Sequence, residues 1–234
     1  MLDNGFMLPD CYYSIRLINK LVMLDKHNKL GLDQIKKSIY WAKKYHSDQK
    51  RKSGEPYYTH PLEVAYIVSD YLLQTDVIIA AILHDIVEDT EVTAEMIRDA
   101  FDARTEQIVN RLTRDRPDGT KLSVAQILNN AYEHDDKEVL LIKVVDRLHN
   151  MQTVGAKSPN KIQETIEEFI IPALYLENAK ITQELTKLCY ENTDIISALQ
   201  DDYSVPLLEN SRLLSQAFQN ASIQTKILNL LEAK

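Results

Sequence analysis

The residues that most clearly suggest chemistry are His84 and Asp85, which stand side by side in the largely apolar run IIAAILHDIVEDT. A buried imidazole beside a buried carboxylate is costly and usually needs a metal or a reaction to explain it. If this run is helical, Glu88 lies one turn beyond His84 and Asp89 one turn beyond Asp85. Three carboxylates so close together would raise each other's pKa values unless a cation held them. The pattern therefore favours a divalent metal ion, and the alternative is a solvated, acidic helix end.

Two further segments carry residues of the same types. In LLIKVVDRLHNMQT, Asp146 follows the largely apolar run Val139 to Val145, and Asn150 lies one helical turn later on the same face. In RKSGEPYYTHPLEVAYIV, His60 directly precedes Pro61. Proline is well tolerated in the first turn of a helix, so this position predicts a helix start.

Together these segments supply a mixed nitrogen and oxygen donor set: His60, His84, Asp85 and Asp146. Two neutral imidazoles and two carboxylates balance the charge of a divalent ion. They also leave coordination positions for water and a phosphate oxygen, which a catalytic site needs and a closed structural site lacks. Each histidine alone is more often an ordinary polar residue, but the set in this order favours a metal site.

The order of these residues resembles that of the HD-domain phosphohydrolases. The words RKSGEPY-x-x-HP, LHDIVEDT and K-x-x-DRLHNM narrow the resemblance to the hydrolase domain of the RelA/SpoT family, whose members remove pyrophosphate from the 3′ position of ppGpp and pppGpp. The resemblance covers roughly Ile35 to Leu176. Too few residues follow it to hold the family's nucleotidyl-transfer domain, so the chain looks like a small, single-domain alarmone hydrolase.

The resemblance also implies the cofactor and the residues that act on water. It implies one Mn²⁺ ion, although a mixed nitrogen and oxygen donor set can also accept Fe²⁺, Co²⁺ or Zn²⁺. Glu88 and Asp89 match the family's Glu-Asp pair. These two residues are expected to orient or deprotonate the attacking water and to manage the proton on the leaving group.

Substrate contacts are implied at the basic segment that precedes His60. The resemblance places Arg51 and Lys52 against the guanine base, with Ser53 contacting the nucleotide. A guanidinium stacked on a purine gives Arg51 a physical reason to be there. Taken alone, however, such a charged run is more often a solvated surface.

Three residues near Asp146 are further candidates for binding the substrate. Asn150 is expected to hold the ribose or the edge of a phosphate, and Thr153 could join it on the next turn. Lys143 lies on roughly the same helix face as Asp146 and could pair with a phosphate. A structural salt bridge is an equal alternative for Lys143.

The chain that carries these residues is predicted to form one helix after another. Only five glycines occur, strand-like alternation is hard to find, and the fold class predicted is all-α, a compact HD-domain bundle of about nine or ten helices. We expect an N-terminal helical extension over 1–30, a phosphohydrolase core over 31–180 and C-terminal helices packing on that core over 181–234, all in one domain.

Individual helix boundaries can also be predicted. A first helix is expected from about Pro9 to Lys26, and Pro61 is expected to open the third. Thr75 or Asp76 is expected to cap a fourth helix, which would carry the His-Asp pair at its far end.

Composition limits the partners and the compartment. A formal net charge of −8 over 234 residues argues against broad nucleic-acid binding, so the expected partner is a small guanosine nucleotide. The longest apolar run, Val77 to Leu83, is too short to cross a bilayer, and no signal sequence is evident. Cys11 and Cys189 are isolated, which favours a reducing compartment and a cytoplasmic protein. The sequence does not indicate an oligomeric state.

Two other functions remain compatible with the same residues. A broader HD-type nucleotide or cofactor phosphohydrolase would keep the metal chemistry and change the substrate. A non-catalytic nucleotide sensor would keep the fold and lose turnover. The RKSGEPY motif favours an alarmone hydrolase over a broader phosphohydrolase. The intact Glu88 and Asp89 pair argues against a non-catalytic sensor.

Overall fold

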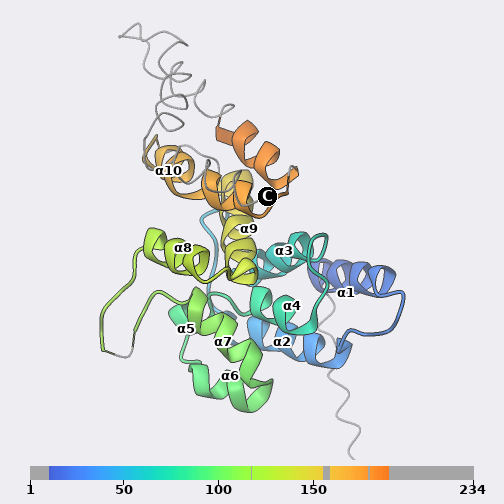
Figure 1. Cartoon of the computed structure of the whole chain (residues 1–234). Helices are drawn as coiled ribbons and strands as arrows, with labels where there is room; N and C mark the ends of the chain where they lie inside the picture. Colours follow the sequence, from blue (N-terminus) through green and yellow to red (C-terminus); the bar gives the residue numbers. More distant parts are fainter. Residues whose placement is uncertain (1–10, 117, 155–158, 179, 190–234) are drawn as a thin grey trace, which may run out of the picture. The chain divides into compact units, whose positions relative to one another are not determined.

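A computed structural model describes residues 11–116, 118–154, 159–178 and 180–189. Within these ranges the protein is helical and contains no strand, and its only β-type pairings are isolated bridges between Lys50 and Pro56 and between Asp115 and Lys121. The predicted all-α class is confirmed. Residues 180–189 are helical, and the ten labelled helices (Figure 1) are α1 Tyr12–Leu24, α2 Leu32–Tyr45, α3 Thr59–Val68, α4 Thr75–Ile82, α5 Ile86–Asp89, α6 Ala94–Ala100, α7 Ala103–Leu112, α8 Val124–Glu133, α9 Lys137–Val154 and α10 Pro159–Tyr175.

The chain divides into two compact units, one ending at Asp146 and the other beginning at Arg147. The predicted division into an extension, a core over 31–180 and C-terminal helices stays a prediction. In the described part of the chain, no helix is both long enough and apolar enough to span a membrane.

Helix α4 forms the centre of the first unit. All of its residues from Val77 to Ile82 are buried, and it packs against α2, α3 and α7. A helix that is apolar on every side must be surrounded by other helices. The chain that leaves α4 therefore starts from a rigid, central position.

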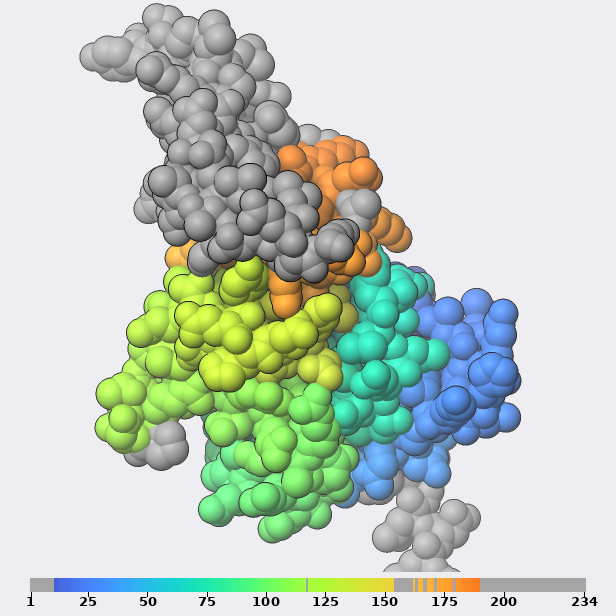
Figure 2. Space-filling model, viewed as in Figure 1, coloured from blue at the N-terminus to red at the C-terminus, as the bar shows by residue number. Residues whose placement is uncertain are grey.

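Helix α1 packs against α3, and the two form a continuous surface in Figure 2. It is shorter than predicted. Cys11 has an extended backbone, and its thiol accepts a hydrogen bond from the Ser14 amide, so the helix begins at Tyr12. Helix α1 ends at Leu24, before Lys26, and Pro9 lies outside the described residues.

Two predicted helix starts are also displaced. Helix α3 begins at Thr59, which places both His60 and Pro61 in its first turn. Thr75 does not cap α4, because its hydroxyl accepts a hydrogen bond from the Gly31 amide at 2.9 Å instead. The residue at the N-cap position is Gln74, and its side chain makes no capping hydrogen bond.

The second unit is organised around the end of α9 and α10. Arg147 pairs with Glu164 through an Nη2–Oε1 distance of 2.6 Å, and its guanidinium carbon lies 4.3 Å from the centre of the Phe169 ring. A small buried cluster completes the described core of this unit: Met151, Ile162 and Cys189.

Candidate active site

The His84-Asp85 pair lies in a turn between two helices, so the predicted continuous helix through this pair is wrong. Helix α4 ends at Ile82, because the backbone of Leu83 leaves the helical conformation, and α5 begins at Ile86. The turn ends the shared helix face that was predicted for His84 and Glu88. The predicted spacing of Asp85 and Asp89 survives, because the Asp89 amide donates to the Asp85 carbonyl at 3.0 Å.

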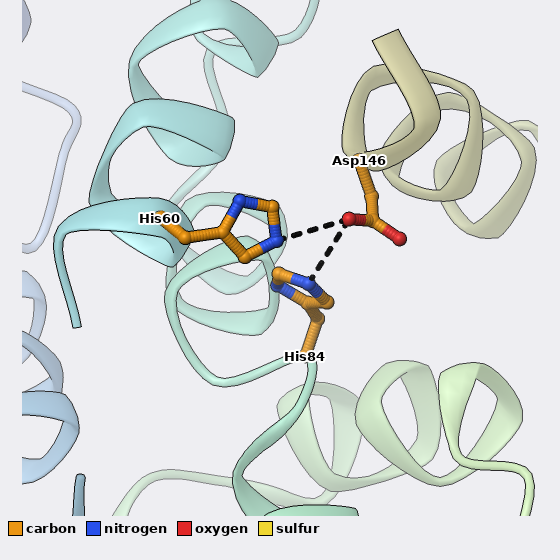
Figure 3. Close-up of side chains that lie close together, drawn as sticks. All are labelled: His60, His84 and Asp146. Carbon is orange, nitrogen blue, oxygen red and sulfur yellow. Dashed lines mark ion pairs between the residues drawn. The ribbon is translucent and has the colours of Figure 1, made fainter. Parts of the chain in front are cut away.

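Three separate elements bring the first three candidate ligands together. His60 comes from the first turn of α3, His84 from the turn after α4, and Asp146 from α9 (Figure 3). Asp146 Oδ1 lies 3.0 Å from His60 Nε2 and 3.8 Å from His84 Nε2. One ligand atom from each of the three residues lies within 4.8 Å of the others.

Asp85 adds a second carboxylate to this group. Its Oδ2 atom lies 3.1 Å from His84 Nε2 and 3.9 Å from His60 Nε2. The four residues predicted as metal ligands are therefore neighbours in space, although His60 and Asp146 are far apart in the sequence. We call His60, His84, Asp85 and Asp146 the ligand cluster.

The orientation of His84 fits a metal ligand. The residue is fully buried, and its Nδ1 atom lies 2.9 Å from the carbonyl oxygen of Ala81. The carbonyl can only accept, so Nδ1 carries a proton and Nε2 is the nitrogen that can present a lone pair to a metal ion. Nε2 is a buried nitrogen that has no hydrogen-bond partner within the described structure. A histidine whose second nitrogen is fixed by a carbonyl is the usual arrangement at a metal site.

Opposite charges dominate the electrostatics of the ligand cluster. Burial lowers the pKa of His84, but the carboxylates of Asp85 and Asp146 outweigh burial and raise it to about 10. Burial raises the pKa of both carboxyl groups, yet His84 brings that of Asp85 below its usual value, and His60 and His84 bring that of Asp146 well below it. A bound cation would take the place of the imidazole protons in this balance.

The structure gives Glu88 and Asp89 different surroundings. Glu88 Oε1 accepts a hydrogen bond from the backbone amide of Arg114 at 2.5 Å, which ties α5 to the chain that follows α7. Asp89 is an exposed residue, yet desolvation of its carboxyl group, followed by the charge of Asp85, raises its pKa. The two predicted catalytic carboxylates are therefore neighbours in sequence with distinct environments.

Tyr57 is a site residue that the sequence reasoning missed. Its hydroxyl donates a hydrogen bond to Asp85 Oδ2 at 2.7 Å. Burial, followed by the charge of Asp85, raises the pKa of Tyr57 far above its ordinary value. The available signal was its position within the RKSGEPYYTHP word, three residues before His60.

His46 and Gln49 were also missed. His46 is buried, and burial lowers its pKa. Its ring lies 4.9 Å from the Tyr57 ring, and its Nδ1 atom lies 2.8 Å from Gln49 Oε1. Gln49 in turn donates from Nε2 to the carbonyl oxygen of Asp89 at 2.7 Å. No sequence motif marks these contacts, because they join the segment after α2 to Tyr57 and to the end of α5.

The predicted base-binding residues lie in a tight loop. The Arg51 amide donates to the Glu55 carbonyl at 2.8 Å, and Gly54 has a φ of 91° that closes the turn. Lys52 and Ser53 are exposed at its tip. The loop leads directly into Tyr57 and α3, but the predicted contacts with a nucleotide base stay predictions.

Lys143 is a buried cation on the same helix as Asp146. It is only 6% exposed and, among the residues that the structure describes, its ammonium group makes no hydrogen bond or ion pair. Its charge contributes to the low pKa of Asp85. Within the described ranges, Lys143 therefore has no partner for the structural salt bridge that was the alternative to phosphate binding.

Asn150 and Thr153 follow Asp146 on α9 but belong to the unit that begins at Arg147. Thr153 is exposed, and its hydroxyl donates to the His149 carbonyl at 2.8 Å. Their predicted roles in substrate binding stay predictions.

Comparison with known proteins places these residues in a family. Residues 38–170 match the family described as HD domain. The chain is 34% identical over 196 residues to the GTP pyrophosphokinase rsh of Brucella ovis, and 36% identical over 160 residues to the guanosine-3′,5′-bis(diphosphate) 3′-pyrophosphohydrolase of Haemophilus influenzae. These matches cover 79% and 64% of this chain but only 26% and 24% of the two relatives.

A solved structure has a similar fold. It is a metazoan ortholog of SpoT that hydrolyzes ppGpp, it is 21% identical to this chain, and it superposes with a TM-score of 0.56 over 68% of this chain and 94% of its own. The match over residues 38–170 includes His60, His84, Asp85 and Asp146. The chain therefore belongs to the HD-domain family.

Proposed function

We propose that this protein hydrolyses the 3′-pyrophosphate of ppGpp and pppGpp in a metal-dependent reaction, which yields GDP or GTP and pyrophosphate. The observation that carries the proposal is the buried Nε2 atom of His84, which makes no hydrogen bond in the described structure and faces His60, Asp85 and Asp146. The name of the Haemophilus influenzae relative supports the choice of substrate.

The ligand cluster would hold one divalent ion, which we propose to be Mn²⁺. Carboxylate oxygens suit Mn²⁺, imidazole nitrogens also suit Fe²⁺ and Zn²⁺, and the two carboxylates match the charge of a divalent ion. Such an ion supplies a Lewis acid for a phosphoryl oxygen and makes a nearby water more acidic.

The side chains beside the ligand cluster would move the protons. In the hydrolysis, the oxygen of water forms a bond to phosphorus, the bond from phosphorus to O3′ breaks, and O3′ takes up a proton. Asp89 is suited to accept the proton of the attacking water, because its pKa is raised toward the range in which a carboxylate is an effective base. Glu88 would act with Asp89, and in addition it holds the chain at Arg114.

The substrate would be held at its base and at its phosphates. Arg51 and Lys52, with Ser53, would lie against the guanine, since a guanidinium stacks well on a purine. Lys143 would face the phosphates, because its buried ammonium acts on Asp85 only through its charge and makes no ion pair or hydrogen bond within the described residues. A net charge of −8 is consistent with a small nucleotide as partner rather than a nucleic acid, and we propose a cytoplasmic location.

A comparison of three substrates tests this proposal. We would measure kcat and KM for ppGpp, for its adenine counterpart and for a 2′-phosphorylated dinucleotide, all with Mn²⁺. The proposal predicts the highest kcat/KM for ppGpp. Comparable efficiency on all three would instead indicate a broad nucleotide phosphohydrolase, and binding of ppGpp without turnover would indicate a sensor.

The variant Arg51→Ala tests the position of the base. A stacking contact is made equally in the ground and transition states, so its loss acts as a loss of uniform binding. We expect KM for ppGpp to rise by more than kcat falls. A fall in kcat at unchanged KM would place Arg51 near the reacting phosphorus instead.

A further inference from the structure

The hydroxyl of Tyr57 acts on an oxygen of the ligand cluster itself. It donates to Asp85 Oδ2 at 2.7 Å, and the same oxygen lies 3.1 Å from His84 Nε2. The direction of this hydrogen bond is fixed, because a carboxylate oxygen accepts and the phenol carries the proton. Tyr57 therefore holds the rotation of the Asp85 carboxylate.

Aromatic packing keeps this hydroxyl in place. The ring of Tyr57 lies 4.9 Å from that of His46 with a tilt of 37°, and 6.1 Å from that of His60 with the edge-on angle of 72°. His46 is itself buried at the end of α2. A ring confined between two others loses little further freedom when it makes its hydrogen bond, so the contact costs little entropy.

The same loop also holds Asp89. Gln49 donates from its side-chain Nε2 to the backbone carbonyl oxygen of Asp89 at 2.7 Å. The backbone carbonyl of Gln49 accepts a hydrogen bond from the Tyr57 backbone amide at 2.9 Å. The side-chain amide of Gln49 is oriented by His46 at 2.8 Å. The loop therefore reaches Asp85 through the Tyr57 hydroxyl, and it reaches Asp89 both at its carbonyl oxygen through Gln49 and at its carboxyl group through Tyr57.

We propose that Tyr57 is a positioning residue that aims the Asp85 carboxylate into the ligand cluster, and that Gln49 fixes Asp89 relative to it. This inference rests on the proposed metal-dependent hydrolysis. Residues that orient metal ligands typically contribute about 10- to 100-fold to metal affinity or activity. Tyr57 would therefore act through Asp85 and not through contact with the substrate.

The variant Tyr57→Phe tests this proposal, because it removes the hydroxyl and keeps the ring. Its matched control is Tyr45→Phe, since Tyr45 packs its ring 5.4 Å from Trp41 and makes no hydrogen bond through its hydroxyl in the described structure. Titration of the full chain with Mn²⁺ alone, followed by calorimetry, gives the Kd without any nucleotide. We expect Tyr57→Phe to raise this Kd about 10- to 100-fold and Tyr45→Phe to leave it unchanged.

Kinetics with ppGpp at saturating Mn²⁺ separate positioning from substrate binding. We expect Tyr57→Phe to lower kcat while KM stays within about twofold, because the lost contact is made to Asp85 and not to the nucleotide. A wild-type Kd for Mn²⁺ in Tyr57→Phe would overturn the proposal. So would a raised KM at unchanged kcat, which would place Tyr57 against the substrate.

A second variant tests the other end of the loop. Gln49→Leu removes the hydrogen bond to Asp89 and leaves Tyr57 intact, so we expect a lower kcat with a wild-type Kd for Mn²⁺. An unchanged kcat would contradict the part of the proposal that concerns Gln49. If the wild-type chain binds Mn²⁺ but leaves ppGpp intact, the proposed function fails, and the Kd values still decide the role of Tyr57.

Discussion

The Nε2 atom of His84 is placed to bind a metal ion, because the other ring nitrogen, Nδ1, is already held by the carbonyl oxygen of Ala81. We therefore expect His84→Ala to lose metal and turnover together, each by at least about 100-fold, since a ligand contributes more than the residues that merely orient it. Metal content after dialysis and kcat measure the two effects. His27→Ala, at an exposed histidine, is the matched control. Wild-type metal content in His84→Ala would show that the ligand cluster is wrongly assigned.

Glu88 has a proposed role in proton transfer and a structural role in holding the Arg114 amide, and two substitutions distinguish these roles. Glu88→Gln keeps an oxygen that can accept from the Arg114 amide but removes the carboxylate that would act with Asp89 on the attacking water, so kcat should fall by about 10²- to 10⁴-fold with metal affinity unchanged. Glu88→Ala removes both roles and should also lower the melting temperature. If Glu88→Gln retained the wild-type rate while Glu88→Ala did not, Glu88 would be an anchor for the chain at Arg114 and would take no part in proton transfer.

The loop that carries Arg51 and Lys52 depends on one glycine. Gly54 has a φ of 91°, a conformation that strains any residue with a Cβ atom, although no other atom lies within 4 Å of that position. We expect Gly54→Ala to distort the loop and to raise KM for ppGpp more than it lowers kcat. Gly119→Ala, at a φ of 81° in a different loop, is the control for strain alone. An equal effect of both variants on KM would argue against a substrate role for the first loop.

His46 gives the end of α2 a dependence on pH. Burial lowers its pKa below the ordinary 6.5, so the unfolded chain binds a proton more readily than the folded chain does. The contribution of His46 to the free energy of unfolding should therefore be at its full value above about pH 6.5 and should decrease as the pH falls below that value. Urea unfolding of the chelator-treated protein between about pH 5 and pH 8 measures the slope. His46→Gln should flatten it, and an unchanged slope would assign it to other groups.

At the scale of the molecule, the helical class predicted from the sequence holds for the residues that the structure describes, and the four residues predicted as metal ligands lie close together. Their binding of a metal ion stays a prediction. The fold class follows from composition and periodicity, which act along the chain. The ligand cluster was predicted because each member adjoins an apolar helical run, and buried polar groups in such places are costly without a function. Both kinds of signal are local in sequence.

Contacts that depend on tertiary packing could not be predicted in the same way. The Tyr57 hydroxyl and Asp85 are 28 residues apart, and Glu88 and the Arg114 amide are 26 apart. The break after α4 was missed because Leu83 is a good helix former and neither glycine nor proline marks the turn. Such features require knowledge of how the helices pack.

The most direct test of the proposed function is a product analysis on the whole protein. The full chain would be incubated with ppGpp in the presence and absence of Mn²⁺, and the products would be separated and quantified. The proposed chemistry predicts GDP and pyrophosphate in equal amounts, formed only with a divalent cation and absent with His84→Ala. Release of single phosphate groups, or equal turnover after removal of all divalent metal, would contradict it.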